Sequence, residues 1–215
     1  MEAQARTNLR QLLHHLRSAL PEGGRFITAD SQNILWRSTP EFAIDVAAFE
    51  QAAARGLEAG KAGDEVASRK ELEKAASLYG GNFMPGLYDE WVEEERKRLR
   101  QKFSDVLGQL VVLLEQTGGF SSAIQYAERL LALDPLCETS YQTLMHLHAL
   151  KGDRAAALLV YHHCATVLRR ELDTEPGPAT RKLRDELTRQ DVISSNKPNM
   201  PTRTGATQLA LTGRQ

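Results

Sequence analysis

The sequence contains few of the residues on which covalent or metal chemistry depends. Its 215 residues include two cysteines, Cys137 and Cys164, and 6% aromatic residues, and its net charge at pH 7 is −1. Two distant thiols without chelating spacing are typical of a reduced intracellular protein, not of a disulfide scaffold or a zinc site. A net charge near zero argues against binding polyanions over the whole surface, so any nucleic-acid contact must use a local basic patch.

Long apolar runs and catalytic motifs are missing as well. Arg6, Arg10, His14, His15 and Arg17 interrupt every apolar stretch near the N-terminus, and no segment reaches the ~18 apolar residues of a membrane span. The patterns G-x-x-x-x-G-K-S/T, G-x-G-x-x-G, H-E-x-x-H and G-x-S-x-G do not occur, so the usual phosphate-binding and hydrolytic sites are not encoded. We expect a cytoplasmic protein that is not an enzyme, with no catalytic residue, no metal, no cofactor and no membrane partner.

The histidines and aromatic residues suit packing better than chemistry. The paired histidines do not share a helix face, because adjacent helical residues diverge by about 100°. We expect His148 to line the core or the groove of a helical array and the other three to be exposed: His146, His162 and His163. Four aromatic residues could line a peptide groove, but we expect them to fill the core between helices: Trp91, Tyr126, Tyr141 and Tyr161.

A repeat with a period of 34 residues organises the middle of the chain. Leu110, Gly118, Ala123 and Ala127 align with Leu144, Gly152, Ala157 and Tyr161. This period is typical of tetratricopeptide-type helical hairpins, in which small residues allow close helix contact and glycine ends the first helix of each pair. The step from Gly63 to Ser68 repeats that from Gly118 to Ala123, which predicts a divergent first copy.

The remaining pattern predicts the helices of this array. We expect helices over 46–59, with Asp45 as the N-cap, and over 64–78, 88–116, 121–133, 137–150, 154–170 and 178–189. The apolar residues expected in the helix over 64–78 are Val66, Leu72, Ala75 and Leu78. The Gly- and Pro-punctuated loop 79–87 is expected to fold back onto the array. After Gln190 the apolar periodicity ends, which predicts a linker.

The first forty residues form a separate pattern. Leu9, Leu12, Leu13, Leu16 and Leu20 make one apolar stripe of a helix over 5–20, opposite a face rich in hydrogen-bonding and basic residues. Two β-prone segments, 25–28 and 34–37, then predict a hairpin. A helix followed by a hairpin ends a winged helix-turn-helix, with the hairpin as the wing. A plain helix and hairpin that cap the repeat array would give the same local pattern.

Several motifs together resemble a known family. They are the leucine-rich terminal helix with Arg10 and Arg17, the segment Asp45-Val46-Ala47-Ala48-Phe49-Glu50, the segment Leu130-Leu131-Ala132-Leu133-Asp134-Pro135 and the ending Glu171-Leu172-Asp173-Thr174-Glu175-Pro176-Gly177-Pro178. Over residues 3 to 190 the chain resembles the junction of an OmpR-type winged helix with the bacterial transcriptional activator domain of SARP and AfsR-like regulators. The resemblance implies a mainly α fold: a tetratricopeptide-like array preceded by the last helix and wing of a winged helix.

The same resemblance implies a function in transcription. The winged helix would bind promoter DNA, with base or phosphate contacts from Thr7, Arg10, Gln11, His14 and Arg17 and backbone contacts from Arg25 and Arg37. The repeat domain would support promoter binding and activation, form a homodimer, or contact RNA polymerase or another protein. The alternative is a stand-alone tetratricopeptide-type scaffold that binds a peptide or protein without touching DNA.

The implied layout has three parts. Residues 1–40 are the C-terminal part of a winged helix, 45–190 the activator domain, and 191–215 a linker. A complete winged helix begins with strands and two further helices, which implies that the chain is a fragment. The ending Leu211-Thr212-Gly213-Arg214-Gln215 resembles the entry to a signal-transduction ATPase domain, so we expect such a domain downstream.

Overall fold

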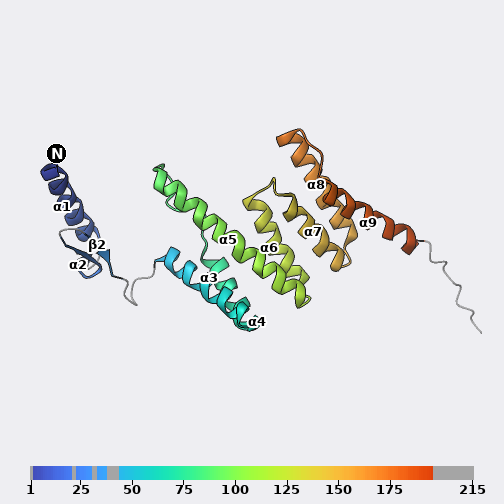
Figure 1. Cartoon of the computed structure of the whole chain (residues 1–215), viewed down its shortest axis with the longest axis horizontal. Helices are drawn as coiled ribbons and strands as arrows, with labels where there is room; N and C mark the ends of the chain where they lie inside the picture. Colours follow the sequence, from blue (N-terminus) through green and yellow to red (C-terminus); the bar gives the residue numbers. More distant parts are fainter. Residues whose placement is uncertain (1, 21–22, 31–32, 38–43, 196–215) are drawn as a thin grey trace, which may run out of the picture. The chain divides into compact units, whose positions relative to one another are not determined.

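The computed structural model describes residues 2–20, 23–30, 33–37 and 44–195. Contacts divide the chain into two compact units, Met1–Leu133 and Asp134–Gln215. The first unit contains α1 (Glu2–Ala19), α2 (Gly23–Phe26), β1 (Ile27–Ala29), β2 (Ile34–Trp36), α3 (Asp45–Lys61), α4 (Glu65–Leu78), α5 (Glu90–Gln116) and α6 (Phe120–Leu133); the second contains α7 (Glu138–Leu150), α8 (Arg154–Leu172) and α9 (Pro178–Ser195) (Figure 1). The expected mainly helical array is confirmed.

Three helical hairpins repeat the same turn. Gly63, Gly118 and Gly152 follow the first helix of each pair with φ of +80°, +73° and +86°, a conformation that glycine adopts without a steric cost. Asp64 and Asp153 then cap α4 and α8, because each carboxylate accepts the backbone N–H three residues later. The structure therefore confirms the tetratricopeptide-like repeat, with α3 and α4 as its first copy.

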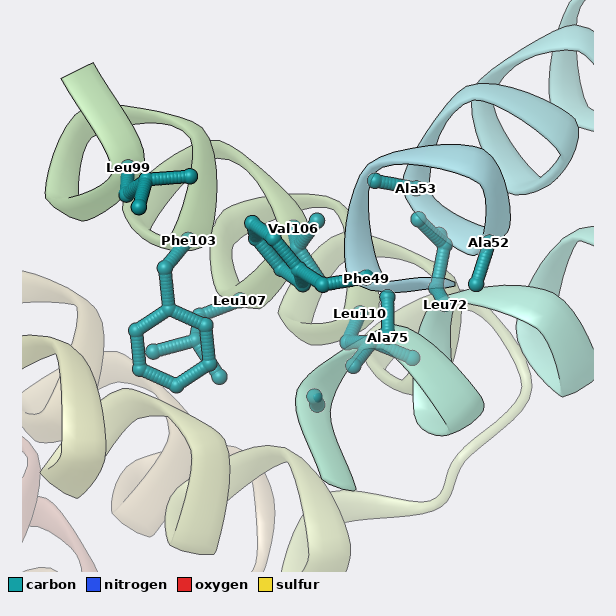
Figure 2. Packing of buried hydrophobic residues seen from close by; sticks show 11 residues of the cluster. Phe49, Ala52, Ala53, Leu72, Ala75, Leu99, Phe103, Val106, Leu107 and Leu110 are labelled. Carbon is teal, nitrogen blue, oxygen red and sulfur yellow. The ribbon is translucent and has the colours of Figure 1, made fainter. Parts of the chain in front are cut away.

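The core of the first unit is built from α3, α4, α5 and α6. Buried side chains of α3, α4 and α5 interdigitate around Phe49, Leu72 and Leu107 (Figure 2). Tyr79, at the end of α4, stacks on Phe103 with 3.9 Å between ring centroids and 8° between ring planes. This stack fixes the start of loop 79–87 against α5, and Phe83 of that loop is partly buried on the same core. The loop folds back as expected.

The pairing of α3 with α4 depends on small residues. The buried Ser68 hydroxyl donates to the carbonyl of Gly56 at 2.8 Å. A Cβ atom added at Gly56 would lie 2.7 Å from Cγ of Leu72, closer than packed carbons approach. The two helices can therefore pack at this distance only with glycine at position 56.

The second unit holds its last helix through a carboxylate. Glu138 of α7 accepts from the backbone N–H of Gly177 at 2.8 and 3.1 Å and from the hydroxyl of Thr180 at 2.6 Å. Thr180 is fully buried and also accepts from the Gln142 amide at 2.9 Å. The segment Pro176-Gly177-Pro178 thus places the N-terminus of α9 on an anion, which the helix dipole favours.

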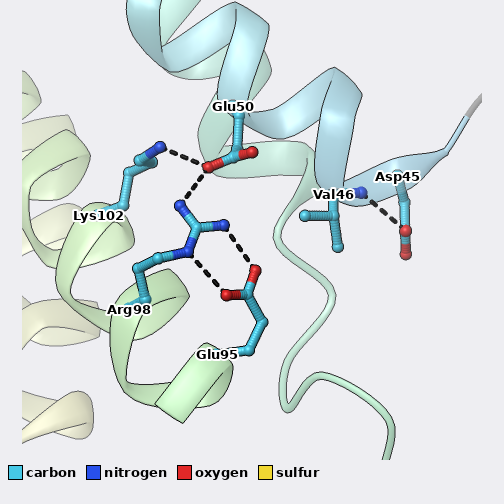
Figure 3. Close-up of polar contacts among 6 residues, drawn as sticks. All are labelled: Asp45, Val46, Glu50, Glu95, Arg98 and Lys102. Atoms are coloured by element: carbon cyan, nitrogen blue, oxygen red, sulfur yellow. Dashed lines mark hydrogen bonds and ion pairs between the residues drawn. The ribbon is translucent and has the colours of Figure 1, made fainter. Parts of the chain in front are cut away.

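Four local expectations need correction or a sharper boundary. Trp91 is 55% exposed instead of buried, because it lies about 100° around α5 from its fully buried neighbour Val92, on the outer face of the helix. Asp45 is the first residue of α3, not its N-cap, and its carboxylate accepts from the adjacent Val46 N–H at 2.7 Å (Figure 3). Val66, expected on the apolar side of α4, is 82% exposed. Helix α9 continues to Ser195, beyond the Gln190 at which periodicity ends.

Candidate functional site

Helix α1 carries the residues expected to contact DNA. Thr7, Arg10, Gln11 and His14 recur at steps of three and four along one face of the helix, and all four are exposed. The hydroxyl of Ser18, one turn further on, donates to the carbonyl of His14 at 2.9 Å. The structure therefore brings these hydrogen-bonding and basic side chains together on one surface.

The opposite face of α1 is apolar and open. Leu9, Leu12 and Leu16 are 46%, 65% and 47% exposed. An amphipathic helix of this kind normally buries such a stripe against a neighbouring element. None of the described residues covers this one fully.

Arg17 connects α1 to the hairpin. Its Nη2 donates to the carbonyl of Ile27, the first residue of β1, at 3.0 Å. Ile27 is buried and pairs with Trp36 in the antiparallel register of β1 and β2. Arg17 is partly buried, unlike the other candidate residues of α1. Its guanidinium orients the hairpin relative to the helix, a role that sequence reasoning did not identify.

The hairpin is confirmed, but its strands are shorter than expected. Arg25 lies in the single helical turn α2 and not in a strand, and β1 begins at Ile27. Arg37 directly follows β2, and its backbone N–H donates to the carbonyl of Phe26 at 2.7 Å. Arg25 and Arg37 are exposed and flank the same end of the hairpin, because Arg25 adjoins Phe26 and Arg37 is the other residue of that hydrogen-bonded pair.

The histidines and the buried cysteine of the described residues do not gather into a metal-binding cluster. No three His, Cys, Asp or Glu side chains among the described residues lie close enough to hold a metal ion. His146, His162 and His163 are exposed. His148 is half-buried, and its buried Nδ1 has no hydrogen-bond partner within the described part of the chain. Burial raises the pKa of the Cys164 thiol to about 11, which keeps it protonated and unreactive.

Three of the four aromatic residues considered for a groove serve packing instead. Tyr141 and Tyr161 are buried, and Tyr126 is partly buried on the core of the first unit.

A pocket bounded by α3, loop 79–87 and α5 has a volume of about 40 Å³, far below the ~300 Å³ of a typical ligand pocket. None of the described helices is long and apolar enough to cross a membrane.

A charged cluster links α3 to α5, and only its part within α5 follows from helical spacing. Arg98 pairs with Glu95 one turn away, as the local charge pattern indicates, but both Arg98 and Lys102 also donate to Glu50 of α3 (Figure 3). The hydrogen bonds from Arg98 and Lys102 lower the pKa of Glu50. No sequence signal joins residues this far apart, so the cluster could be found only in the structure.

Comparison with known proteins shows which proteins the repeat array is similar to. The family profile described as the bacterial transcriptional activator domain matches residues 44–188. The regulatory protein AfsR of Streptomyces coelicolor is 26% identical over 189 residues, which cover 88% of this chain and 19% of AfsR. The transcriptional regulatory protein MoaR1 of Mycobacterium tuberculosis is 26% identical over 197 residues, which cover 87% of this chain and 62% of MoaR1.

A solved structure shows the same fold. Mycobacterium tuberculosis EmbR, determined in complex with a low-affinity phosphopeptide, aligns with a TM-score of 0.64 and 23% identity over 88% of this chain and 50% of the EmbR chain. This chain therefore spans only part of the length of each of these relatives. The profile match begins at the residue before α3, ends within α9 and takes in most of the chain, so this protein belongs to the bacterial transcriptional activator domain family.

Proposed function

We propose that this chain is the activator domain of a DNA-binding transcriptional regulator, together with part of its DNA-binding unit. Its family membership and its similarity to proteins named as regulators support this proposal. The observation that carries it is the exposed hydrogen-bonding face of α1, with a hairpin held beside it by Arg17. Proteins that read DNA present such a helix to the major groove and use flanking basic residues on phosphates.

The residues divide by role. Thr7, Arg10, Gln11 and His14 contact base edges or phosphates in this proposal, because their side chains donate and accept on one exposed face. Arg25 and Arg37, at one end of the hairpin, contact the phosphate backbone. Arg17 orients the hairpin, through its hydrogen bond to Ile27, besides adding positive charge.

The array serves this DNA-binding unit and not catalysis. We assign residues 1–40 to the DNA-binding part, 45–190 to the activator domain and 191–215 to a linker. Helix α9 continues through the first five residues of that last segment, to Ser195, and 196–215 lie outside the described residues. The activator domain supports promoter binding, forms a homodimer, or contacts RNA polymerase or another protein. The regulator works in the cytoplasm, where bacterial promoter DNA lies.

DNA selection followed by titration tests this function. Duplexes would be selected from a random library with the chain, and the best sequence titrated at several salt concentrations with wild type, Arg10→Ala and Arg17→Ala. Loss of one phosphate contact lowers the slope of log affinity against log salt by about one, and loss of a base contact costs about 1–3 kcal/mol. Arg181→Ala, an exposed arginine of α9, is the matched control and should change neither quantity.

The result also decides between the two candidate functions. If Arg10→Ala and Arg17→Ala bind every selected duplex as wild type does at all salt concentrations, the α1 face is not a DNA surface. A scaffold without DNA contact would then be the better description. That second candidate is favoured by the exposed aromatic residues near the start of α5.

A further inference from the structure

Large apolar side chains gather, exposed, where the chain enters α5. Tyr88 is 85% exposed and Trp91 55%, and Met84 and Leu87 are each more than two-fifths exposed. These four residues, called the α5 entry patch here, lie within eight consecutive positions of the sequence. Tyrosine, tryptophan and methionine are enriched in protein interfaces, and most binding energy falls on such aromatic anchors. Exposed apolar groups that adjoin one another mark interaction sites more often than scattered ones do.

The backbone beneath this patch is held in one conformation. Arg96 of α5 donates from Nε to the carbonyl of Phe83 at 2.7 Å and from Nη2 to the carbonyl of Met84. Met84 has φ of +45°, which is strained for a residue other than glycine. Strain of this kind persists only where the surroundings impose it, and it concentrates at binding sites. The patch is therefore preorganised, which reduces the entropy lost when a partner binds.

Trp91 is supported from below. Its ring and the Phe83 ring form a T-shaped pair with 6.4 Å between centroids and 74° between planes, and Phe83 packs on the core of the first unit. The indole thus contacts a fixed aromatic ring and is still 55% exposed. This is the arrangement expected of an anchor residue and not of a mobile surface side chain.

The patch has an acidic border. The segment 89–95 contains five acidic residues; Glu93 pairs with Arg96 and Glu95 with Arg98. Among the described residues no ion pair neutralises Asp89, Glu90 or Glu94. The helix dipole explains acidic residues in the first turn of α5, but its effect fades beyond that turn, where Glu94 lies. Three carboxylates that take part in no ion pair among the described residues therefore carry negative charge beside the apolar side chains.

These features select one kind of partner. An extended strand needs free backbone groups on the surface that it joins, but the Phe83 and Met84 carbonyls already accept from Arg96. A helix satisfies its own backbone and can lay an apolar stripe on Tyr88 and Trp91. Cationic side chains beside that stripe would meet Asp89, Glu90 and Glu94.

We propose that the α5 entry patch and its acidic border dock a basic amphipathic helix of a partner protein. The proposal is independent of DNA binding by α1, since it uses other residues of the chain. For a transcriptional regulator it supplies a way to recruit a second protein while α1 is engaged elsewhere.

Two designed peptides test the proposal directly. Both are helical with the same leucine stripe, and they differ only in carrying lysine or glutamate beside the stripe. Each would be titrated into the whole chain carrying Trp36→Phe, so that Trp91 is the remaining tryptophan, and its fluorescence followed. We expect the lysine peptide to bind at least tenfold more tightly than the glutamate peptide and to shift the Trp91 emission to shorter wavelength.

Variants then locate the contact by calorimetry. Trp91→Ala and Tyr88→Ala should each weaken binding of the lysine peptide at least tenfold, and Trp91→Phe by less. Glu94→Gln should weaken binding several-fold and lower its salt dependence. The controls are Leu159→Ala and Glu58→Gln, which change an exposed leucine and an exposed glutamate elsewhere.

Circular dichroism would confirm that each variant is folded. Equal binding of the two peptides, or unchanged binding by Trp91→Ala, would overturn the proposal. So would a wild-type chain that dimerises in light scattering and becomes monomeric on Trp91→Ala, because a second copy would then occupy the patch. Loss of DNA binding by Arg10→Ala with peptide binding intact would separate this proposal from the DNA-binding function.

Discussion

Replacing Glu138 with alanine is expected to loosen the attachment of α9 to the rest of the second unit. The substitution removes the acceptor for the backbone N–H of Gly177 and for the hydroxyl of Thr180. The Gln142 amide still donates to that hydroxyl at 2.9 Å, but the buried O–H loses its own acceptor. A buried donor left unpaired costs more than an average hydrogen bond gains.

The expected loss in the free energy of unfolding follows from these contacts. A hydrogen bond to a charged group contributes about 1.5–3 kcal/mol, and a carboxylate at a helix N-terminus adds about 0.3–1 kcal/mol. Two such bonds would give more, but Glu138 is only half-buried, so water can replace the acceptor for Gly177. We expect Glu138→Ala to lower the free energy of unfolding by about 2–3 kcal/mol.

Urea unfolding followed by circular dichroism measures this loss, and hydrogen exchange shows where it falls. The α9 amides should exchange faster in Glu138→Ala, whereas those of α3 and α4 should not. A double-mutant cycle with Thr180→Val should give a coupling of about 0.5–3 kcal/mol. The control Glu186→Ala breaks only an exposed pair with Lys182 at 3.9 Å and should cost less than about 0.5 kcal/mol. A loss in Glu138→Ala no larger than in this control would refute the reasoning.

Three further predictions concern packing, thiol reactivity and the pH dependence of stability. Gly56→Ala should lower the free energy of unfolding by about 1–3 kcal/mol, because the added Cβ would overpack against Leu72. A Cβ at Gly108 meets no atom within 4 Å, so Gly108→Ala should leave that free energy unchanged or raise it by up to about 1 kcal/mol. Urea midpoints that rank the two variants the other way would contradict this prediction. At pH 8 a thiol reagent should modify Cys137 well before Cys164, whose pKa of about 11 leaves roughly one thiol in a thousand ionised. Because the unfolded thiol ionises near pH 9 and the folded one near 11, Cys164 contributes a loss of stability as pH rises through that interval, and Cys164→Ala should flatten the decline in urea midpoints.

The repeat shows how much the sequence could predict. Its helices and turns depend on residues close together in the chain, so the period of apolar residues and the glycines at positions 63, 118 and 152 located three hairpins correctly. The β-hairpin was found for the same reason, with strand ends that differ from the expected ones by at most two residues. Burial was less predictable: Trp91 has the size of a core residue, but the outer face of α5 leaves it exposed.

The candidate DNA surface was predicted less completely than the hairpins but better than the burial of Trp91. Helical spacing alone placed Thr7, Arg10, Gln11 and His14 on one face, and the structure shows that face exposed. Arg17 belongs to the same set by spacing, but its guanidinium also holds Ile27 of the hairpin. That these residues contact DNA stays a prediction.

The sequence by itself determined the helical hairpins, their turns and the amphipathic character of α1, because each follows from periodicity and conformational preference within a few residues. Only the tertiary structure decided which side chains meet across long separations. It placed the carboxylate of Glu138, a residue of α7, at the N-terminus of α9. It also placed the Arg96 guanidinium against the strained loop before α5, and the Glu50 carboxylate between Arg98 and Lys102. The physical reason is that a carboxylate or guanidinium can pair with many groups, and the packing of the helices selects the one within reach.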